Sequence, residues 1–318
     1  MRKRTYYILV LLAAVLVLSA VIVVCKPFLK SVYEKKTEQV SPEDQYTRQI
    51  DQQANIKEEA NQASFEIHFF NVGEADSALV MCDGHYMLID GGNPGNSSFL
   101  YSYLESHGIN YIEYIVCSHA HTDHVGGLAG ALNYAKVGFA YSPVASYDSR
   151  AFNSFIKYLS QQGKNIKVPF SGETIELGSA VITFIGPIDM SLAETDENNS
   201  SIVLRIEYGS TSFLFTGDAE TEEESSLVKS DFMLKSTVLK VGHHGSNSSS
   251  SQRFIDVVDP QFAVISVGVN DYDHPNDDVI KRLEKYCDRI YRTDLNGNIV
   301  CTSDGEALAF YVEMDTNL

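Results

Sequence analysis

Short apolar runs alternate with amphipathic stretches along most of the chain after residue 64. Runs rich in β-branched and aromatic residues are typical of strands, and spaced apolar positions between them indicate helices. Strands are expected at 65–70, 78–81, 86–89, 114–117, 137–141, 181–185, 202–208, 212–216, 238–241, 262–267, 290–292, 297–302 and 307–312. Helices are expected at 98–107, 125–134, 151–162, 220–229, 252–258 and 277–286. This order predicts an α/β (α+β) fold, an αββα sandwich of two mixed sheets that pack face to face with helices outside.

The N-terminus shows a different pattern. Three basic residues at 2–4 precede an apolar run from Tyr6 to Cys25, which is long enough to cross the hydrocarbon core of a bilayer. We expect a single-pass signal anchor within 1–33, a polar linker at 34–64 and a folded domain at 65–318 outside the cell membrane. No Ala-x-Ala cleavage site follows the run. A cleaved signal, which would give a secreted protein, and a buried soluble helix remain the alternatives.

Charge and cysteine content limit the possible functions. The net charge is −18, and beyond the three basic residues at 2–4 there are 21 basic against 42 acidic residues, a balance of −21. Non-specific affinity for nucleic acid comes from Lys and Arg, so a general DNA-binding surface is disfavoured, although a local groove or bound metals could hold a phosphodiester. The five cysteines form no C-x-x-C pair, and a bridge between Cys287 and Cys301 stays open.

The most informative motif follows the strand expected at 114–117. Residues 117–126 read Cys-Ser-His-Ala-His-Thr-Asp-His-Val-Gly, which places His119, His121, Asp123 and His124 within six residues. In a loop that leaves a strand, His119 and His121 can point the same way and bind one ion, while Asp123 and His124 turn toward a second. Zinc accepts such ligands, and two ions about 3.5–4 Å apart can share a hydroxide. The motif predicts a two-metal hydrolytic site; a polar turn with chance histidines is the alternative.

Two other strand ends carry an aspartate beside glycine. Asp90 precedes Gly91 and Gly92, and a carboxylate in this position can orient a metal-binding histidine by accepting its second N–H. Asp218 follows Gly217 at the end of the strand expected at 212–216, and it is the candidate ligand that bridges the two ions. A plain turn aspartate is the alternative in each case.

Histidines follow two further strands. His243 is expected to be the remaining ligand of the second ion, whereas His244 or Ser246 is expected to meet substrate oxygens. His274, before a proline, is expected to contact the leaving group or an anionic substrate, and a loop histidine is the alternative. The remaining histidines of the catalytic domain are interpreted as non-functional: His68, His85 and His107.

Together these motifs resemble the metallo-β-lactamase-fold hydrolases, whose hallmark is His-x-His-x-Asp-His. Within that fold, 65–318 is most similar to the C-terminal domain of the DNA-uptake competence proteins of the ComEC/Rec2 type. The matching segments are 71–77, 90–92, 118–123, 198–204, 216–220, 239–246 and 291–297. The resemblance implies a metal-dependent hydrolase with two Zn or Mn ions. It does not imply transport. In the competence proteins this domain stands beside a channel of many membrane helices, whereas one membrane segment is expected in this chain.

Two departures from the family pattern bear on the site. The first motif usually runs Asp-Val-Gly-Gln-Gly-Asp, and here Asn71, Glu74 and Ala75 replace three residues, which adds a negative charge. The wider fold also places a histidine between the first cluster and the bridging aspartate, and this chain has none there; Asn198, which matches the competence-like subgroup, stands in that region as a candidate substrate contact. We expect lower occupancy at the first metal position and a preference for manganese over zinc.

Three functions are compatible with these observations. The preferred one is hydrolysis of a phosphoester, including DNA or nucleotide phosphodiesters, by a hydroxide held between the two metals, with Asp123, Asp90 and His274 in the catalytic set. The second is hydrolysis of a carbonyl substrate such as a β-lactam, lactone or thioester. The third is a binding domain without turnover. Acidic charge makes long DNA one candidate substrate among several.

Overall fold

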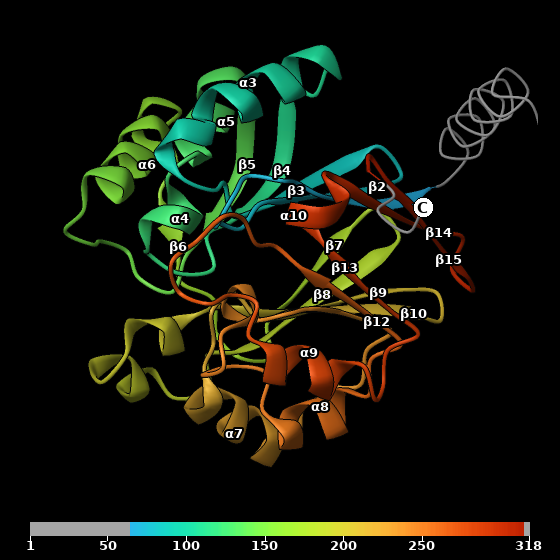
Figure 1. Cartoon of the computed structure of the whole chain (residues 1–318). Helices are drawn as coiled ribbons and strands as arrows, with labels where there is room; N and C mark the ends of the chain where they lie inside the picture. Colours follow the sequence, from blue (N-terminus) through green and yellow to red (C-terminus); the bar gives the residue numbers. More distant parts are fainter. Residues whose placement is uncertain (1–63, 315–318) are drawn as a thin grey trace, which may run out of the picture. The chain divides into compact units, whose positions relative to one another are not determined.

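The computed structural model describes residues 64–314. The expected membrane segment and almost all of the linker lie outside the described residues. Within 64–314, no helix is long and apolar enough to cross a membrane. The expected arrangement of two mixed sheets between two layers of helices is confirmed (Figure 1).

The first sheet contains the N-terminal strands and the last two strands of the chain. Its order within the described residues is β15-β14-β1-β2-β3-β4-β5-β6. The pairs from β15 to β3 are antiparallel, and those from β3 to β6 are parallel. The strands are β1 (Phe65–Phe69), β2 (Ala78–Cys82), β3 (His85–Ile89), β4 (Tyr111–Val116), β5 (Lys136–Tyr141), β6 (Ile166–Lys167), β14 (Ile299–Ser303) and β15 (Leu308–Val312).

The second sheet is built from the middle of the chain and repeats this change of direction. Its order within 64–314 is β13-β12-β11-β10-β9-β8-β7. Strands β7 to β10 are antiparallel, and β10 to β13 are parallel. The strands are β7 (Thr174–Leu177), β8 (Ala180–Gly186), β9 (Val203–Tyr208), β10 (Thr211–Phe215), β11 (Val238–Lys240), β12 (Phe262–Ile265) and β13 (Arg289–Arg292).

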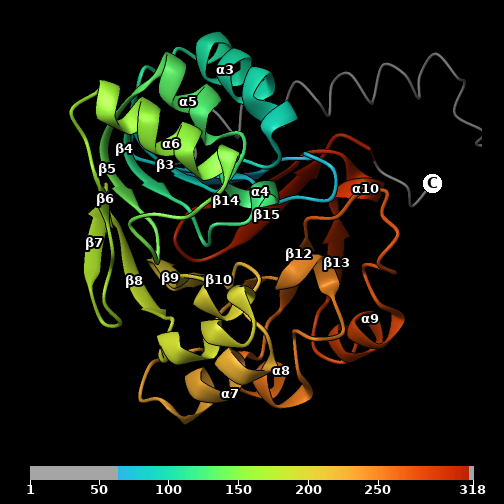
Figure 2. The ribbon, with the colours of Figure 1, turned by 90° about the vertical axis from the view of Figure 1, so that its left-hand side faces the viewer.

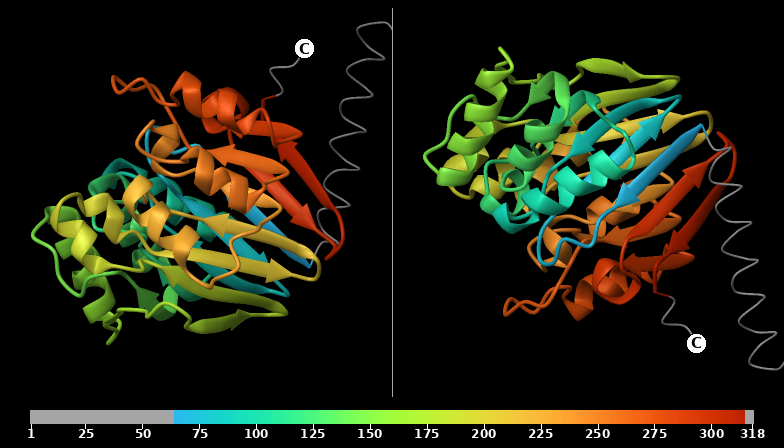
Figure 3. Two further views of the ribbon diagram at one scale, coloured as in Figure 1. Left: turned by 90° about the horizontal axis from the view of Figure 1, so that it is seen from below. Right: turned by 90° about the horizontal axis from the view of Figure 1, so that it is seen from above.

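Helices cover the outer face of each sheet, as Figures 1 and 2 show. Helices α3, α5 and α6 lie over the first sheet, and α7, α8 and α9 lie over the second, which the views from below and above in Figure 3 also show. The α-helices are α3 (Ser97–Ser106), α4 (Thr122–Val125), α5 (Leu128–Tyr134), α6 (Arg150–Gln161), α7 (Thr221–Lys229), α8 (Gln252–Val258), α9 (Asp277–Leu283) and α10 (Thr293–Asn296). The 3-10 helices are η1 (Pro94–Asn96), η2 (Met190–Glu194), η3 (Glu197–Ser200) and η4 (His243–Gly245).

The core between the sheets follows from alternation along the strands. In β1, Phe65, Ile67 and Phe69 are fully buried, whereas the two residues between them are partly exposed. The two phenylalanine rings stack on Phe213 and Phe215 of β10 in the opposite sheet. This period of two puts one apolar face of each sheet inside and leaves the other face for the helices.

Several expected elements differ in detail. The helix expected at 125–134 is two helices, α4 and α5, because the chain passes tightly against the glycine turn after β3 at Gly126 and Gly127; a Cβ on Gly127 would lie 1.9 Å from the carbonyl oxygen of Gly91. Strands β6 and β7 were not expected from the sequence. Cys287 and Cys301 are both free thiols, so the possible bridge between them is not formed.

The topology brings the chemically interesting loops to one edge. Strands β3 and β4 are parallel, and so are β10, β11 and β12. The carboxyl ends of neighbouring parallel strands open at the same edge of a sheet, which is where ligands bind in such sheets. The segments that leave these strands carry Asp90, the run 117–124, Asp218, the run 242–246 and His274.

Candidate metal centre

Four acidic and imidazole side chains form the centre of this edge. One ligand atom from each of Asp123, His124, Asp218 and His244 lies within 4.8 Å of the others. Asp218 Oδ2 is 3.2 Å from His124 Nε2, and Asp123 Oδ2 is 3.3 Å from His244 Nε2. Asp123 is partly exposed and the other three are buried. The group therefore joins donors from both sheets in one buried cluster of opposite charges.

Asp218 faces histidines from two loops, the one after β4 and the one after β11. Besides His124, its Oδ2 atom lies 3.8 Å from Nε2 of His119, 3.8 Å from that of His244 and 3.9 Å from that of His243. The turn before it is tight: Gly217 has φ +51°, and a Cβ there would lie 2.9 Å from the Cβ of Ser118. This central position fits a carboxylate that serves two metal positions at once.

Asp90 supports the cluster from the first sheet. Its Oδ2 atom is 3.0 Å from His124 Nδ1, and its Oδ1 atom accepts a 2.7 Å hydrogen bond from the backbone N–H of Ser118. Fixing one ring nitrogen of a histidine orients the other toward a metal. Asp90 thus directs Nε2 of His124 toward Asp218.

The structure distinguishes the two adjacent histidines after β11. The His244 side chain is 3 % exposed, and its Nδ1 lies 3.0 Å from the carbonyl oxygen of Ser266. The His243 side chain is 23 % exposed, and its Nδ1 lies 3.1 Å from Glu220 Oε1. Both backbones have positive φ, at 48° for His243 and 52° for His244. His244, which the sequence analysis assigned to the substrate, therefore joins the buried group, while His243 lies at its margin.

A buried ion pair that the sequence analysis missed lies beneath His244. Lys240 Nζ donates a 2.6 Å hydrogen bond to Asp76 Oδ2, and the other Asp76 oxygen is 3.4 Å from His244 Nδ1. Both partners are almost fully buried. The signal in the sequence was their place inside the segments 71–77 and 239–246, but nothing there showed that the two would pair.

Electrostatics divide the histidines into neutral and charged rings. Burial and the neighbouring His124 hold the pKa of His119 well below its usual range, so its imidazole is neutral. Burial also lowers the pKa of His124, but Asp218 and Asp90 outweigh it and raise the pKa well above normal. Burial favours a protonated Asp123, yet His124 and His244 hold its pKa at about 2. This carboxylate is therefore anionic and suited to bind a cation.

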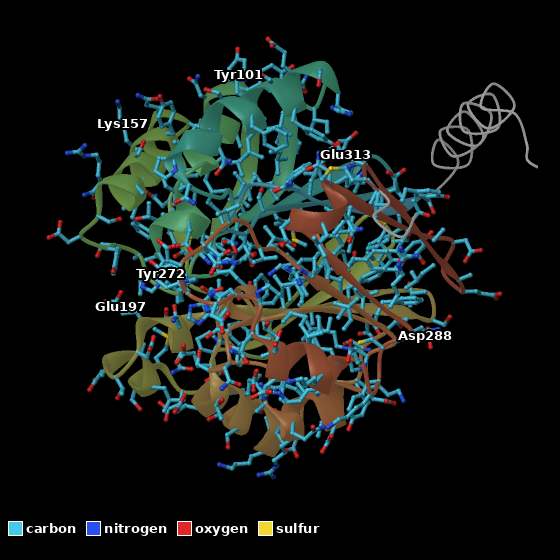
Figure 4. The ribbon with its side chains drawn as sticks, viewed as in Figure 1. Tyr101, Lys157, Glu197, Tyr272, Asp288 and Glu313 are labelled. Carbon is cyan, nitrogen blue, oxygen red and sulfur yellow. The ribbon has the colours of Figure 1, made fainter. Side chains whose placement is uncertain are left out.

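The first metal position is more exposed. His119 is fully buried, whereas the His121 side chain is 34 % exposed and its Nε2 lies 3.2 Å from Glu197 Oε2. Glu197, which the sequence analysis missed, is drawn at the outer edge of the molecule in Figure 4. Asn198 beside it is buried, and its amide donates to Glu220 at 3.4 Å.

Two other expected substrate contacts lie around this centre. His274 Nδ1 is 2.9 Å from Glu74 Oε1, and its ring centroid lies 5.4 Å from that of His243. Tyr272, largely exposed, stacks on His274. The Ser246 hydroxyl pairs with that of Ser248 at 2.9 Å instead of pointing to the carboxylates. His274 therefore lies at the rim of the candidate metal centre, and the Ser246 hydroxyl is directed toward Ser248.

The donor set fits a divalent metal. Among the buried polar atoms of the described residues that have no hydrogen-bond partner, three belong to this group of histidines and Asp218: His119 Nε2, His124 Nε2 and Asp218 Oδ1. A buried polar atom without a partner costs about 1–3 kcal/mol, and a cation at this point would satisfy all three. Imidazole nitrogen with carboxylate oxygen suits zinc and, with more oxygen, manganese. The residues present therefore fit a divalent metal site of the two-position kind.

The fold and this centre define the class of protein. The family model of the Metallo-beta-lactamase superfamily matches residues 71–269, and the chain belongs to this superfamily, whose members are generally metal-dependent hydrolases. CmlA, a diiron beta-hydroxylase from Streptomyces venezuelae, shares the fold with a TM-score of 0.50 at 13 % identity, over 79 % of this chain and 54 % of that one.

Within the superfamily, the resemblance to competence proteins is confirmed. ComE operon protein 3 of Bacillus subtilis (strain 168) is 29 % identical over 74 % of this chain and 32 % of its own length. Competence protein ComA of Neisseria gonorrhoeae is 31 % identical over 72 % of this chain and 31 % of its own length. The chain spans about a third of the length of these relatives.

Proposed function

We propose that the chain is a metal-dependent phosphoesterase with two metal positions, held outside the cell membrane by its N-terminal segment or secreted after cleavage. The observation that supports this most strongly is the buried group of Asp123, His124, Asp218 and His244 with unpaired donor atoms. The second position would be held by this group. The first would be held by His119, His121 and Asp218.

Each residue has a role in this proposal that follows from its position. Asp218 faces both positions and would hold the two ions at a fixed spacing, while Asp90 keeps His124 in place. When bound, two divalent ions supply a water nucleophile of lowered pKa and neutralise charge on a phosphate. His274 would contact the phosphate or the leaving group from the rim, where Glu74 orients its ring.

The similarity to competence proteins supports a DNA phosphodiester or a nucleotide as the substrate class. The chain itself carries acidic residues at the rim, including Glu197 and Glu74, and has a net charge of −18. Because affinity for long polyanions depends on Lys and Arg, short phosphodiesters should be turned over better than duplex DNA.

The test is hydrolysis of bis-p-nitrophenyl phosphate by the purified full-length chain with added manganese or zinc. Asp123→Ala should lower kcat/KM by at least about 100-fold, since removing even an outer partner of a metal ligand costs about 10–100-fold. Asp231→Ala, at an exposed position after α7, is the matched control and should keep full activity. Equal activity of Asp123→Ala and the wild type would refute the proposal, and faster turnover of nitrocefin would favour a carbonyl substrate.

A further inference from the structure

All but one of the histidines at this site are anchored through the same ring nitrogen. Five histidines are held through Nδ1, which leaves Nε2 for the centre. The anchors are Ser118 Oγ for His119 (3.2 Å), Asp90 for His124 (3.0 Å), Glu220 for His243 (3.1 Å), the carbonyl of Ser266 for His244 (3.0 Å) and Glu74 for His274 (2.9 Å). His121 is anchored through the other ring nitrogen. Its Nε2 lies 3.2 Å from Glu197 Oε2, so Nδ1 is the nitrogen that remains for an ion.

Glu197 is itself fixed by a second side chain. The hydroxyl of Tyr147, in the loop between β5 and α6, donates a 2.5 Å hydrogen bond to the same carboxylate oxygen. This bond, together with partial burial, raises the pKa of Tyr147 to about 12, so the hydroxyl keeps its proton and remains a donor. The three residues His121, Glu197 and Tyr147 thus form a chain of contacts from the centre to the surface.

The backbone around Glu197 is also held in place. Its carbonyl accepts a 2.7 Å hydrogen bond from the Ser200 hydroxyl, and Asp196 caps η3 by accepting from the N–H of Asn198. Ser201, the next residue after η3, accepts a 3.0 Å hydrogen bond from the N–H of Asp218. The segment that carries Glu197 is therefore tied to the backbone of Asp218, in the region where the wider fold places its missing histidine.

Exposure separates this arrangement from the rest of the centre. The anchor of His124 is buried, with the Asp90 side chain at 2 % exposure, whereas the Glu197 side chain is 54 % exposed. An ion at His119 and His121 would therefore depend on an anchor that water reaches. An ion at the buried group would not.

We propose that Glu197 and Tyr147 form an outer clamp that presents Nδ1 of His121 and so sets the affinity of the first metal position, making its ion the exchangeable one. This inference rests on the two metal positions of the proposed function. Glu197 is a positioning residue here and not a ligand. Removing an outer-sphere carboxylate of this kind lowers metal affinity by about 10–100-fold in other sites.

The experiment titrates the metal-free, full-length chain with Mn²⁺ and follows free Mn²⁺ by its electron paramagnetic resonance signal. The wild type should bind two ions. Glu197→Gln should bind one ion as the wild type does and the other about 10–100-fold more weakly, and Tyr147→Phe, which changes no charge, should weaken the same ion by less. Glu194→Gln removes a charge three residues away and should change neither constant. Glu197→Asp, which keeps the charge, should recover part of the loss.

Melting of the metal-free proteins shows whether the substitutions act on folding. Equal melting temperatures for Glu197→Gln and the wild type, with one weakened ion, support the clamp. Two ions with unchanged constants in Glu197→Gln overturn it, and so does equal weakening of both ions or an equal effect of Glu194→Gln. A wild type that binds fewer than two ions overturns the two-metal proposal itself as well.

Discussion

His244→Ala tests whether His244, and not its neighbour His243, is a ligand of the buried metal position. His244 Nε2 lies 3.3 Å from Asp123 Oδ2 and 3.8 Å from Asp218 Oδ2, at 3 % side-chain exposure. His243 lies at a similar distance from Asp218, 3.9 Å, but its side chain is 23 % exposed. We expect His244→Ala to weaken the buried ion by at least about 100-fold, or about 2.7 kcal/mol, and His243→Ala to weaken it much less.

The pKa of His244 gives this prediction a second magnitude. Burial lowers that pKa, but Asp218, Asp123 and Asp76 outweigh burial and raise it to about 10 in the metal-free protein. Since pH 7 lies about three units below this pKa, an ion that binds His244 at pH 7 must displace its proton, which costs about 4 kcal/mol. From pH 7 to about 10 this proton alone should raise the apparent metal affinity about tenfold per unit.

Calorimetric titration in buffers of different ionisation enthalpy counts the protons released per ion at pH 7. His244→Ala should release about one proton fewer than the wild type, and the pH dependence of its affinity should be correspondingly shallower. His243→Ala should stay close to the wild type in affinity. Unchanged proton release in His244→Ala, or a larger loss of affinity in His243→Ala, would show that the reasoning is wrong.

Two further predictions concern stability. Lys240→Met leaves the buried Asp76 carboxylate without its cation and should lower the free energy of unfolding by about 3–5 kcal/mol in urea titration, whereas a loss below about 1 kcal/mol would contradict the burial argument. Burial raises the pKa of Glu224 from 4.5 to about 7. The folded state therefore binds this proton more tightly than the unfolded state, and stability from this group should fall by about 3 kcal/mol as pH rises from about 4.5 to 7. Glu224→Gln should flatten that slope, and an unchanged slope would exclude Glu224 as its source.

The strands and the clustering of the histidines and Asp123 in one run could be predicted from the sequence because their signals are local. Apolar alternation marks β1, and His-x-His-x-Asp-His concentrates four side chains that are capable of binding metal in six residues, which a core or an ordinary surface turn rarely needs. Strand β7 was missed because it lies at the edge of its sheet, where Thr174 and Glu176 are exposed and the apolar signal is weak. The break between α4 and α5 was missed because it results from contact with a distant glycine turn, and spaced apolar residues continue across it.

The sequence also could not predict which of the two adjacent rings, His243 or His244, is the more deeply buried. Both residues adopt φ values near +50°, a region that non-glycine residues rarely occupy, and this turn decides which ring faces the carboxylates. No residue pattern indicates such a conformation. Glu197 and Lys240 were missed for a related reason, since each acts through a partner far away in the chain.

The position of the centre between the two sheets has a mechanical consequence. Asp123 and His244 are 121 residues apart in the chain, and they come from opposite sheets. An ion that binds both would close a long loop, which is where a cross-link restricts an unfolded chain most. A bound ion would then act as a removable cross-link between the two sheets of the domain. Because β8 pairs with β9 and β14 with β1, a chelator should lower the melting temperature of the domain without separating its two sheets.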